Sequence, residues 1–139
     1  MALQPVSITV SGFVEKGFAQ ARSSGYPTAN LTLSEPPDIL EGIYCARTKL
    51  PGNDESIPSI VFYGIPHSLP GAVHPRFEVH IFDNDANLYG QGLTVELVAF
   101  VRENKKFETM EQLHSAIEND VAIAREYFKE LSILCLAEL

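Results

Sequence analysis

The chain has 139 residues, of which 45% are hydrophobic and 20% are charged, as in an ordinary globular protein, and this length predicts a single domain spanning residues 1–139. Its formal net charge is −8 at pH 7 without any basic run, which argues against nucleic acid or an anionic membrane as its main partner. It contains no apolar run long enough to cross a bilayer and no signal-peptide pattern, so we expect a cytoplasmic protein.

Short segments of β character fill the first three quarters of the chain. They cover residues 6–14, 28–33, 42–50, 59–63, 76–82 and 93–102, and clusters of Pro, Gly, Asn and Asp separate them. No helix-length pattern stands between them, which disfavours a Rossmann or P-loop architecture. The pattern therefore predicts a mainly β protein, an antiparallel barrel or sandwich.

Residues 25–30 (GYPTAN) combine a turn with the start of a strand. Gly25 accepts positive φ, and Pro27 fixes its own φ near −65°. Alternation along the strand then places Thr28, Asn30 and Thr32 on one face. On residue types alone, these are the solvent-facing side chains of a half-buried strand.

The loop before this turn favours a different interpretation. Residues 17–24 are mostly small or polar, and Lys16 and Arg22 accompany a run of backbone N–H groups, as in loops that bind phosphate. The spacing matches neither a Walker A loop nor a GxGxxG fingerprint.

The last quarter of the chain predicts one amphipathic helix. Thr109 and Gln112 form a capping box, and an apolar stripe follows at three- and four-residue steps. Its members are Met110, Leu113, Ile117, Val121, Ala124, Phe128 and Leu131. We expect this stripe to cover the barrel and expect a solvated face at Asp120, Arg125, Glu126 and Lys129. The apolar tail, residues 133–136, either packs back on the domain or contacts another chain.

Several segments in this order resemble the riboflavin kinase family, which phosphorylates riboflavin to FMN. They are residues 12–17 (GFVEKG) with 25–31 (GYPTANL), 41–46 (EGIYCA), 77–83 (FEVHIFD) with 87–90 (NLYG), and 100–107 (FVRENKKF). The resemblance implies a six-stranded antiparallel Greek-key barrel with a C-terminal helix packed against it. Two segments depart from the family pattern: residues 20–22 read QAR where an RGR run is common, and residues 63–67 (YGIPH) match only in part.

The resemblance also implies a reaction and a nucleotide site. The γ-phosphate of ATP would pass to the 5′-hydroxyl of riboflavin with Mg²⁺ as the cofactor. Thr28 and Asn30 would bind both the metal and the nucleotide phosphates, since Mg²⁺ prefers hard oxygen ligands. The loop with Gly17, Arg22 and Gly25 would wrap the nucleotide.

Glu78 is the expected general base. It alternates with apolar residues along its strand, and desolvation there would raise its pKa toward a range useful for taking the riboflavin hydroxyl proton. The alternative is a surface carboxylate on an edge strand. His80, on the same face, is expected to be a hydrogen-bonded structural histidine.

The resemblance places flavin contacts at Arg102 and Phe107. The residues themselves leave alternatives open: Phe107 can be a hydrophobic staple before the Thr109 cap, and Arg102 a surface charge at a strand end. Cys45 and Cys135 show no metal or CxxC spacing and are expected to be free thiols.

Three functions follow as hypotheses. The first is a stand-alone, monomeric riboflavin kinase that binds riboflavin/FMN and ATP/ADP and makes FMN but not FAD. The second is a non-catalytic riboflavin- or FMN-binding module of the same fold, suggested by the altered residues 20–22. The third is a structural barrel that pairs with a partner through its apolar tail.

Overall fold

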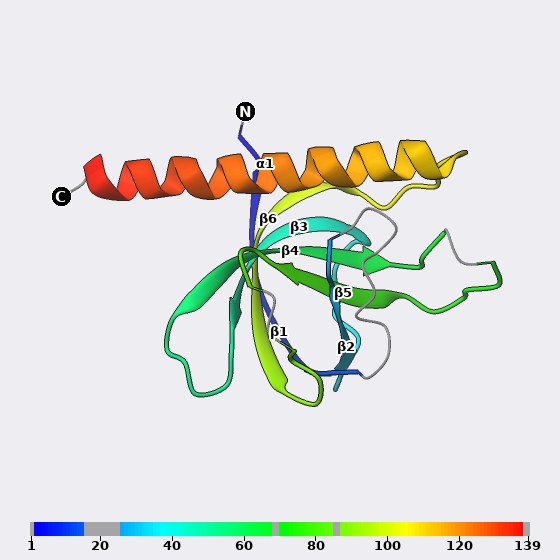
Figure 1. Cartoon of the computed structure of the whole chain (residues 1–139), viewed down its shortest axis with the longest axis horizontal. Coiled ribbons are helices and arrows are strands. Elements are labelled where there is room, and N and C mark those ends of the chain that lie inside the picture. Colours follow the sequence, from blue (N-terminus) through cyan, green and yellow to red (C-terminus); the bar gives the residue numbers. More distant parts are fainter. Residues whose placement is uncertain (1, 16–25, 68–69, 85–86, 138–139) are drawn as a thin grey trace.

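The computed structural model of the protein describes residues 2–15, 26–67, 70–84 and 87–137 and contains six strands and one helix. The elements are β1 (Gln4–Val14), β2 (Ala29–Leu33), β3 (Gly42–Lys49), β4 (Ser56–Gly64), β5 (Arg76–Ile81), β6 (Gly92–Glu103) and α1 (Met110–Ala137) (Figure 1). All six predicted strands are confirmed, with ends that shift by three residues at most. The largest shift is in β4, which begins ahead of Pro58 although proline lacks a backbone donor.

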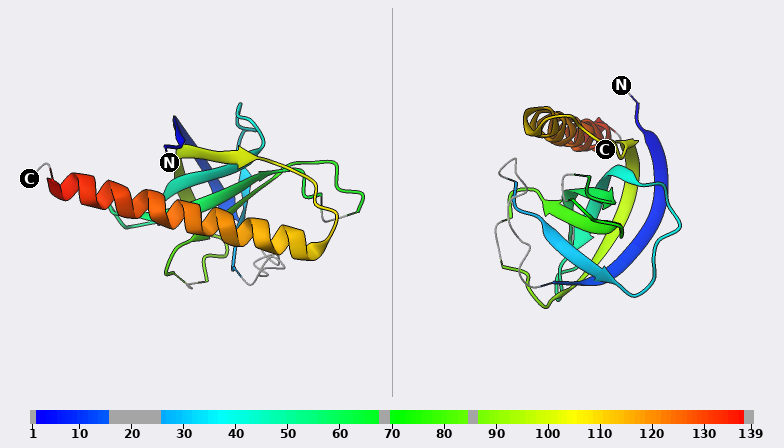
Figure 2. Two further views of the ribbon diagram at one scale, coloured as in Figure 1. Left: turned by 90° about the horizontal axis from the view of Figure 1, so that it is seen from above. Right: turned by 90° about the vertical axis from the view of Figure 1, so that its right-hand side faces the viewer.

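The strands close into a barrel in the order β1-β2-β5-β4-β3-β6, and every neighbouring pair is antiparallel. Strands β3, β4 and β5 form a meander, and β2 and β6 lie beside its two outer strands. This order is that of overlapping Greek keys, so the predicted Greek-key barrel is confirmed. Figure 2 shows the ring of strands with the helix outside it.

The barrel interior is an apolar core. Residues that alternate along each strand point into it, among them Leu31, Val61, Phe77, Val79 and Leu97. Two polar side chains of the described interior, Thr48 and Ser59, are fully buried and hydrogen-bond each other with 2.7 Å between their oxygens. Each hydroxyl is thereby satisfied where no water reaches it.

Helix α1 covers one outer face of the barrel (Figures 1 and 2). Its Ile117, Val121, Ala124 and Phe128 pack on a second core formed by residues on the outside of the barrel, including Ile43, Cys45, Ile60, Phe82 and Ala99. Leu113 and Leu131 are partly buried at its margins, whereas Met110 is 49% exposed. Both cysteines are free thiols as predicted, and burial raises the pKa of the Cys45 thiol to about 12.

The predicted capping box begins α1. The N–H of Gln112 donates to Thr109 Oγ1 at 3.1 Å, and Gln112 Oε1 accepts from the N–H of Glu108 at 3.1 Å. The first bond satisfies a helix-end donor, whereas the second reaches the residue before the Thr109 cap and not the cap itself. They also fix the first turn of the helix beside the site described below.

The apolar tail belongs to the end of α1. Ile133, Leu134 and Leu136 are 56%, 60% and 69% exposed, and this end of the helix extends beyond the strands (Figure 1). The possibility that the tail packs back on the domain is therefore wrong. Within the described part of the chain, no helix has the length and apolar character needed to span a membrane.

Candidate active site

The neighbouring strands β2 and β5 bring three predicted site residues together. Asn30 lies directly opposite Glu78 in the antiparallel ladder, so their side chains share one side of the sheet. The Thr28 hydroxyl donates to Glu78 Oε1 at 3.3 Å. Thr28, Asn30 and Glu78 are 3%, 6% and 4% exposed. Because β5 lies between β2 and β4, the alternative of a surface carboxylate on an edge strand is wrong.

Thr32, the third residue of the predicted polar face, lies apart from this group. It is exposed and donates to the Glu15 carboxylate. The buried polar group therefore consists of Thr28, Asn30 and Glu78. Since the Thr28 hydroxyl donates its proton to the hydrogen bond with Glu78, the lone pairs of its oxygen stay available to a metal ion. Together with the Asn30 carbonyl, they form the sparse set of hard oxygen ligands that suits a Mg²⁺ ion carrying phosphates and water.

His80 anchors the segment that carries Thr28. Its Nδ1 lies 2.7 Å from the carbonyl oxygen of Pro27, and because a carbonyl only accepts, Nδ1 carries the proton. The ring makes edge contacts with Tyr26 and Phe82, with centroids 5.4 and 5.5 Å apart. Burial lowers the pKa of His80 more than the Pro27 hydrogen bond raises it. The expected hydrogen bond of His80 is confirmed, and its structural role stays a prediction.

A pocket opens beside Glu78, between the outer face of the barrel and the first turns of α1. Its apolar lining includes Ile43, Phe62, Leu113 and Ile117, and its polar lining includes Glu78, Arg102 and Lys105. Phe107 also lines it, with Arg102 Cζ and Lys105 Nζ each 5.5 Å from the ring centroid. An apolar slot with a few polar groups at its edge is typical of small-molecule sites.

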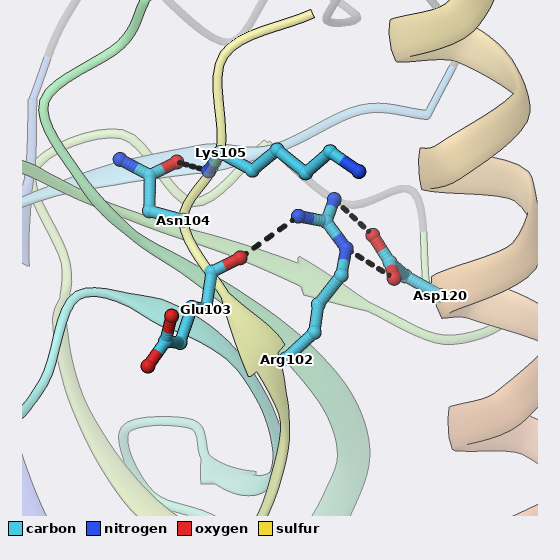
Figure 3. Close-up of polar contacts among 5 residues, drawn as sticks. All are labelled: Arg102, Glu103, Asn104, Lys105 and Asp120. Atoms are coloured by element: carbon cyan, nitrogen blue, oxygen red, sulfur yellow. Dashed lines mark hydrogen bonds and ion pairs between the residues drawn. The ribbon is translucent and has the colours of Figure 1, made fainter.

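Arg102 is held in this pocket wall by Asp120 of α1. Its Nε donates to Asp120 Oδ1 at 2.8 Å and its Nη2 to Oδ2 at 2.7 Å, a two-point ion pair (Figure 3). The Asp120 side chain is only 1% exposed. Burial raises the pKa of its carboxyl, and Arg102 opposes that rise.

Two predictions are corrected by this pair. Asp120 is not part of a solvated face, unlike the exposed Arg125, Glu126 and Lys129, and the alternative of Arg102 as a surface charge at the strand end is wrong, because it pairs with a buried carboxylate. A signal for Asp120 existed: it lies three residues after Ile117 and four before Ala124, which is the spacing of the apolar stripe. A carboxylate on a buried stripe requires a partner of opposite charge.

Sequence reasoning also missed the residues that fasten the pocket wall after β4. Glu41 Oε1 accepts from the N–H of Ile65 at 2.7 Å and from Asn104 Nδ2 at 3.3 Å. Asn104 Nδ2 also donates to the Ile65 carbonyl at 3.1 Å. Gly64 has φ 148°, and a Cβ there would lie 2.5 Å from Glu41 Oε1. Only glycine fits at this turn.

Part of the predicted nucleotide site lies outside the described residues. Lys16, Gly17, Arg22 and Gly25 belong to this part, as do the altered residues at positions 20 and 21. Their roles stay predictions. Among the residues that are described, no group of three or more His, Cys, Asp or Glu side chains could hold a metal.

Comparison with known proteins decides the family. A family model described as riboflavin kinase matches residues 4–128, which is most of the chain. The chain belongs to the riboflavin kinase family. The bifunctional riboflavin kinase/FMN adenylyltransferase of Pseudomonas fluorescens is 34% identical over 116 residues, covering 84% of this chain. The corresponding protein of Haemophilus influenzae is 31% identical over 119 residues. The chain spans only 37% and 38% of the lengths of these two relatives.

Solved structures share the fold. The riboflavin kinase of Trypanosoma brucei aligns over 93% of this chain and 83% of its own, with a TM-score of 0.56 and 19% identity, a likeness that concerns the fold alone. A Streptococcus pneumoniae protein described as a macrolide-efflux protein aligns over 86% of this chain and 39% of its own, with a TM-score of 0.71 and 27% identity. The resemblance to riboflavin kinases in the sequence is thus confirmed.

Proposed function

We propose that this chain transfers the γ-phosphate of ATP to the 5′-hydroxyl of riboflavin and so makes FMN. One observation carries the proposal: the buried Glu78 carboxylate accepts a hydrogen bond from Thr28 on one side and lines the aromatic pocket on the other. Phosphoryl transfer depends mainly on placing the nucleophile in line with the phosphate and on balancing charge. A carboxylate between a phosphate site and a flavin pocket can orient the attacking hydroxyl toward the phosphate.

In this proposal Glu78 is the general base. It accepts the proton of the riboflavin 5′-hydroxyl as the oxygen attacks the γ-phosphorus, and the bond from that phosphorus to the bridging oxygen of ADP breaks. The Thr28 hydroxyl, 3.3 Å away, holds the carboxylate in place. His80 in turn holds Pro27, the residue before Thr28, through a 2.7 Å hydrogen bond.

Thr28 and Asn30 are the proposed ligands of Mg²⁺, and with the loop that contains Gly17, Arg22 and Gly25 they bind the nucleotide. The buried hydroxyl and amide offer neutral oxygens, which leave the remaining coordination positions to phosphate oxygens and water. When bound, the ion would neutralise phosphate charge.

The flavin ring is proposed to occupy the pocket beside Arg102 and Phe107. The apolar lining suits the ring, and the guanidinium supplies donors at its polar edge. All of these residues belong to one chain, so the proposal needs only a monomer. We further propose that the reaction takes place in the cytoplasm, where ATP is available.

The proposal is tested by incubating the protein with riboflavin and Mg-ATP and separating the flavins by chromatography. We expect FMN that depends on both ATP and the metal. Flavin binding without FMN would instead support the non-catalytic module. Absence of both FMN and flavin binding would favour the structural barrel, and a thermal-shift screen with Mg-ADP and FMN would show it, because ligands that bind only the native state stabilise it.

A further inference from the structure

We propose that Asp120 is a positioning residue for the flavin: it fixes the orientation of Arg102 in the pocket wall and thereby sets the affinity for the ring. This inference rests on the proposed function and extends it to a residue outside every motif of the family resemblance. Asp120 is not among the residues that line the pocket. It would act only through Arg102.

The ion pair joins the two elements that enclose the pocket. Arg102 extends from the end of β6. Asp120 extends from α1, eleven residues after the Thr109 cap. Both carboxylate oxygens of Asp120 bind the same guanidinium, at 2.8 and 2.7 Å, and Figure 3 shows the two groups facing each other across the gap between strand and helix. This two-point geometry fixes the plane of the guanidinium as well as its position.

The remaining hydrogen bonds define what Arg102 offers a ligand. A guanidinium has five N–H donors. Asp120 takes one from Nε and one from Nη2, and the carbonyl of Glu103 takes one from Nη1 at 3.1 Å. One donor therefore remains on each terminal nitrogen, and the Arg102 side chain keeps 25% of its surface exposed. Flavins carry carbonyl oxygens and ring nitrogens along one edge, and these are acceptors for such donors.

Burial of Asp120 argues for a role beyond attaching the helix. A buried ion pair is a poor source of net stability, because apolar residues of similar volume serve packing as well or better. The neighbouring stripe residues Ile117, Val121 and Ala124 already attach α1 to the barrel. What the carboxylate adds is a fixed direction for Arg102, whose Cζ lies 5.5 Å from the Phe107 ring centroid.

The experiment compares flavin and nucleotide affinities in Asp120→Asn. This variant keeps the side-chain shape and removes the charge. We expect the dissociation constant for riboflavin, measured by fluorescence, to rise about tenfold, the cost of disturbing one charge-assisted hydrogen bond, while the constant for Mg-ADP stays nearly unchanged. Glu118→Gln, a change of an exposed carboxylate on the same helix, is the matched control and should leave both constants unchanged.

A double-mutant cycle with Arg102→Met tests whether Asp120 acts through Arg102. We expect Asp120→Asn to cause no further loss of flavin affinity once Arg102 is gone. If Asp120→Asn alone fails to fold, the neutral pair Arg102→Met/Asp120→Asn replaces it, and it should bind Mg-ADP normally and riboflavin weakly.

Three results would overturn the inference: an unchanged riboflavin constant in the folded variant or in the neutral pair, an equal loss of riboflavin and Mg-ADP affinity, or the full tenfold loss persisting in the Arg102→Met background. The wild-type protein separates this failure from that of the proposed function. If wild type itself bound no riboflavin, the proposed function would fail and this inference with it. If wild type bound riboflavin and made FMN while Asp120→Asn behaved normally, only the inference would fail.

Discussion

The two sides of the barrel sheet serve different purposes. Among the described residues, the interior holds apolar side chains and one self-satisfied polar pair, Thr48 and Ser59. On the outer side of the sheet, which faces the helix and the pocket, Glu78 and His80 are buried. Asp120 is buried on α1, which packs on this side. Buried charges and polar groups cost stability unless they are well paired. The interior therefore stabilises the fold, whereas the outer side holds chemical groups in place at a cost in stability.

We expect the greatest loss of stability when an interior side chain is truncated. Leu97→Ala removes a fully buried side chain of the inner core and should lower the free energy of unfolding by about 3 kcal/mol. Urea denaturation measures this change. Turnover per folded molecule at low temperature should stay near the wild-type value. Leu134→Ala, at a 60% exposed position, is the control and should change little; a large loss of turnover by folded Leu97→Ala would contradict the division.

Thr28→Val should give the opposite result. It keeps the side-chain volume but removes the hydroxyl that donates to Glu78 and that we propose as a metal ligand. We expect kcat/KM for Mg-ATP to fall roughly 10- to 100-fold, as for loss of groups that orient a metal site. The melting temperature should change little, and steady-state kinetics across ATP and Mg²⁺ concentrations provide the test. Normal kinetics in this variant would remove Thr28 from the site.

A pH-dependent effect is expected from His80. Burial lowers its pKa in the folded protein below the ordinary 6.5, so the unfolded chain binds more protons between these two values, and stability falls as pH falls through that window. The contribution of neutral His80 to stability is fully present above pH about 6.5. His80→Asn keeps a donor near the position of Nδ1 without the titration. Thermal melts from pH 7 to pH 5 should show a smaller loss in this variant; equal losses would contradict the assignment.

Removing the N-terminal cap of α1 should cause only a modest change. Thr109→Ala removes the hydrogen bond to the Gln112 N–H and should cost about 1 kcal/mol of unfolding free energy. Because the first turn of α1 lines the pocket, KM for riboflavin should rise modestly and KM for ATP should not. Thr109→Ser, which keeps the hydroxyl, serves as the control and should behave like wild type.

Much of the fold could be predicted because its signals are local. Alternation along each strand separates the interior from the outer side, as in Phe77 and Val79 against Glu78 and His80, and turn residues mark the breaks. Strand β4 was predicted too short because Pro58 reads as a breaker. Pro58 is tolerated in β4 because it lies next to the end of β5. Its carbonyl oxygen still accepts a hydrogen bond from the N–H of Phe82 at 3.0 Å.

The site was predictable only in part, because its contacts join distant residues. Thr28 and Glu78 are 50 positions apart, and the family resemblance, not periodicity, paired them. The burial of Asp120 was not predicted, because its charge suggests the solvated face of the helix. Its spacing, however, matches the buried apolar stripe. The Glu41, Ile65 and Asn104 contacts depend on how three chain segments meet after strand closure, which no local pattern specifies.

The role of Glu78 as the general base is tested by the rate of FMN formation by Glu78→Gln in a single turnover with Mg-ATP. This change preserves shape and hydrogen-bonding capacity at the junction of the phosphate site and the pocket, but it removes the proton acceptor. We expect the rate to fall about 1,000-fold, with riboflavin and Mg-ADP affinities nearly unchanged. A rate close to that of wild type would contradict the account, because the carboxylate would then not be the base.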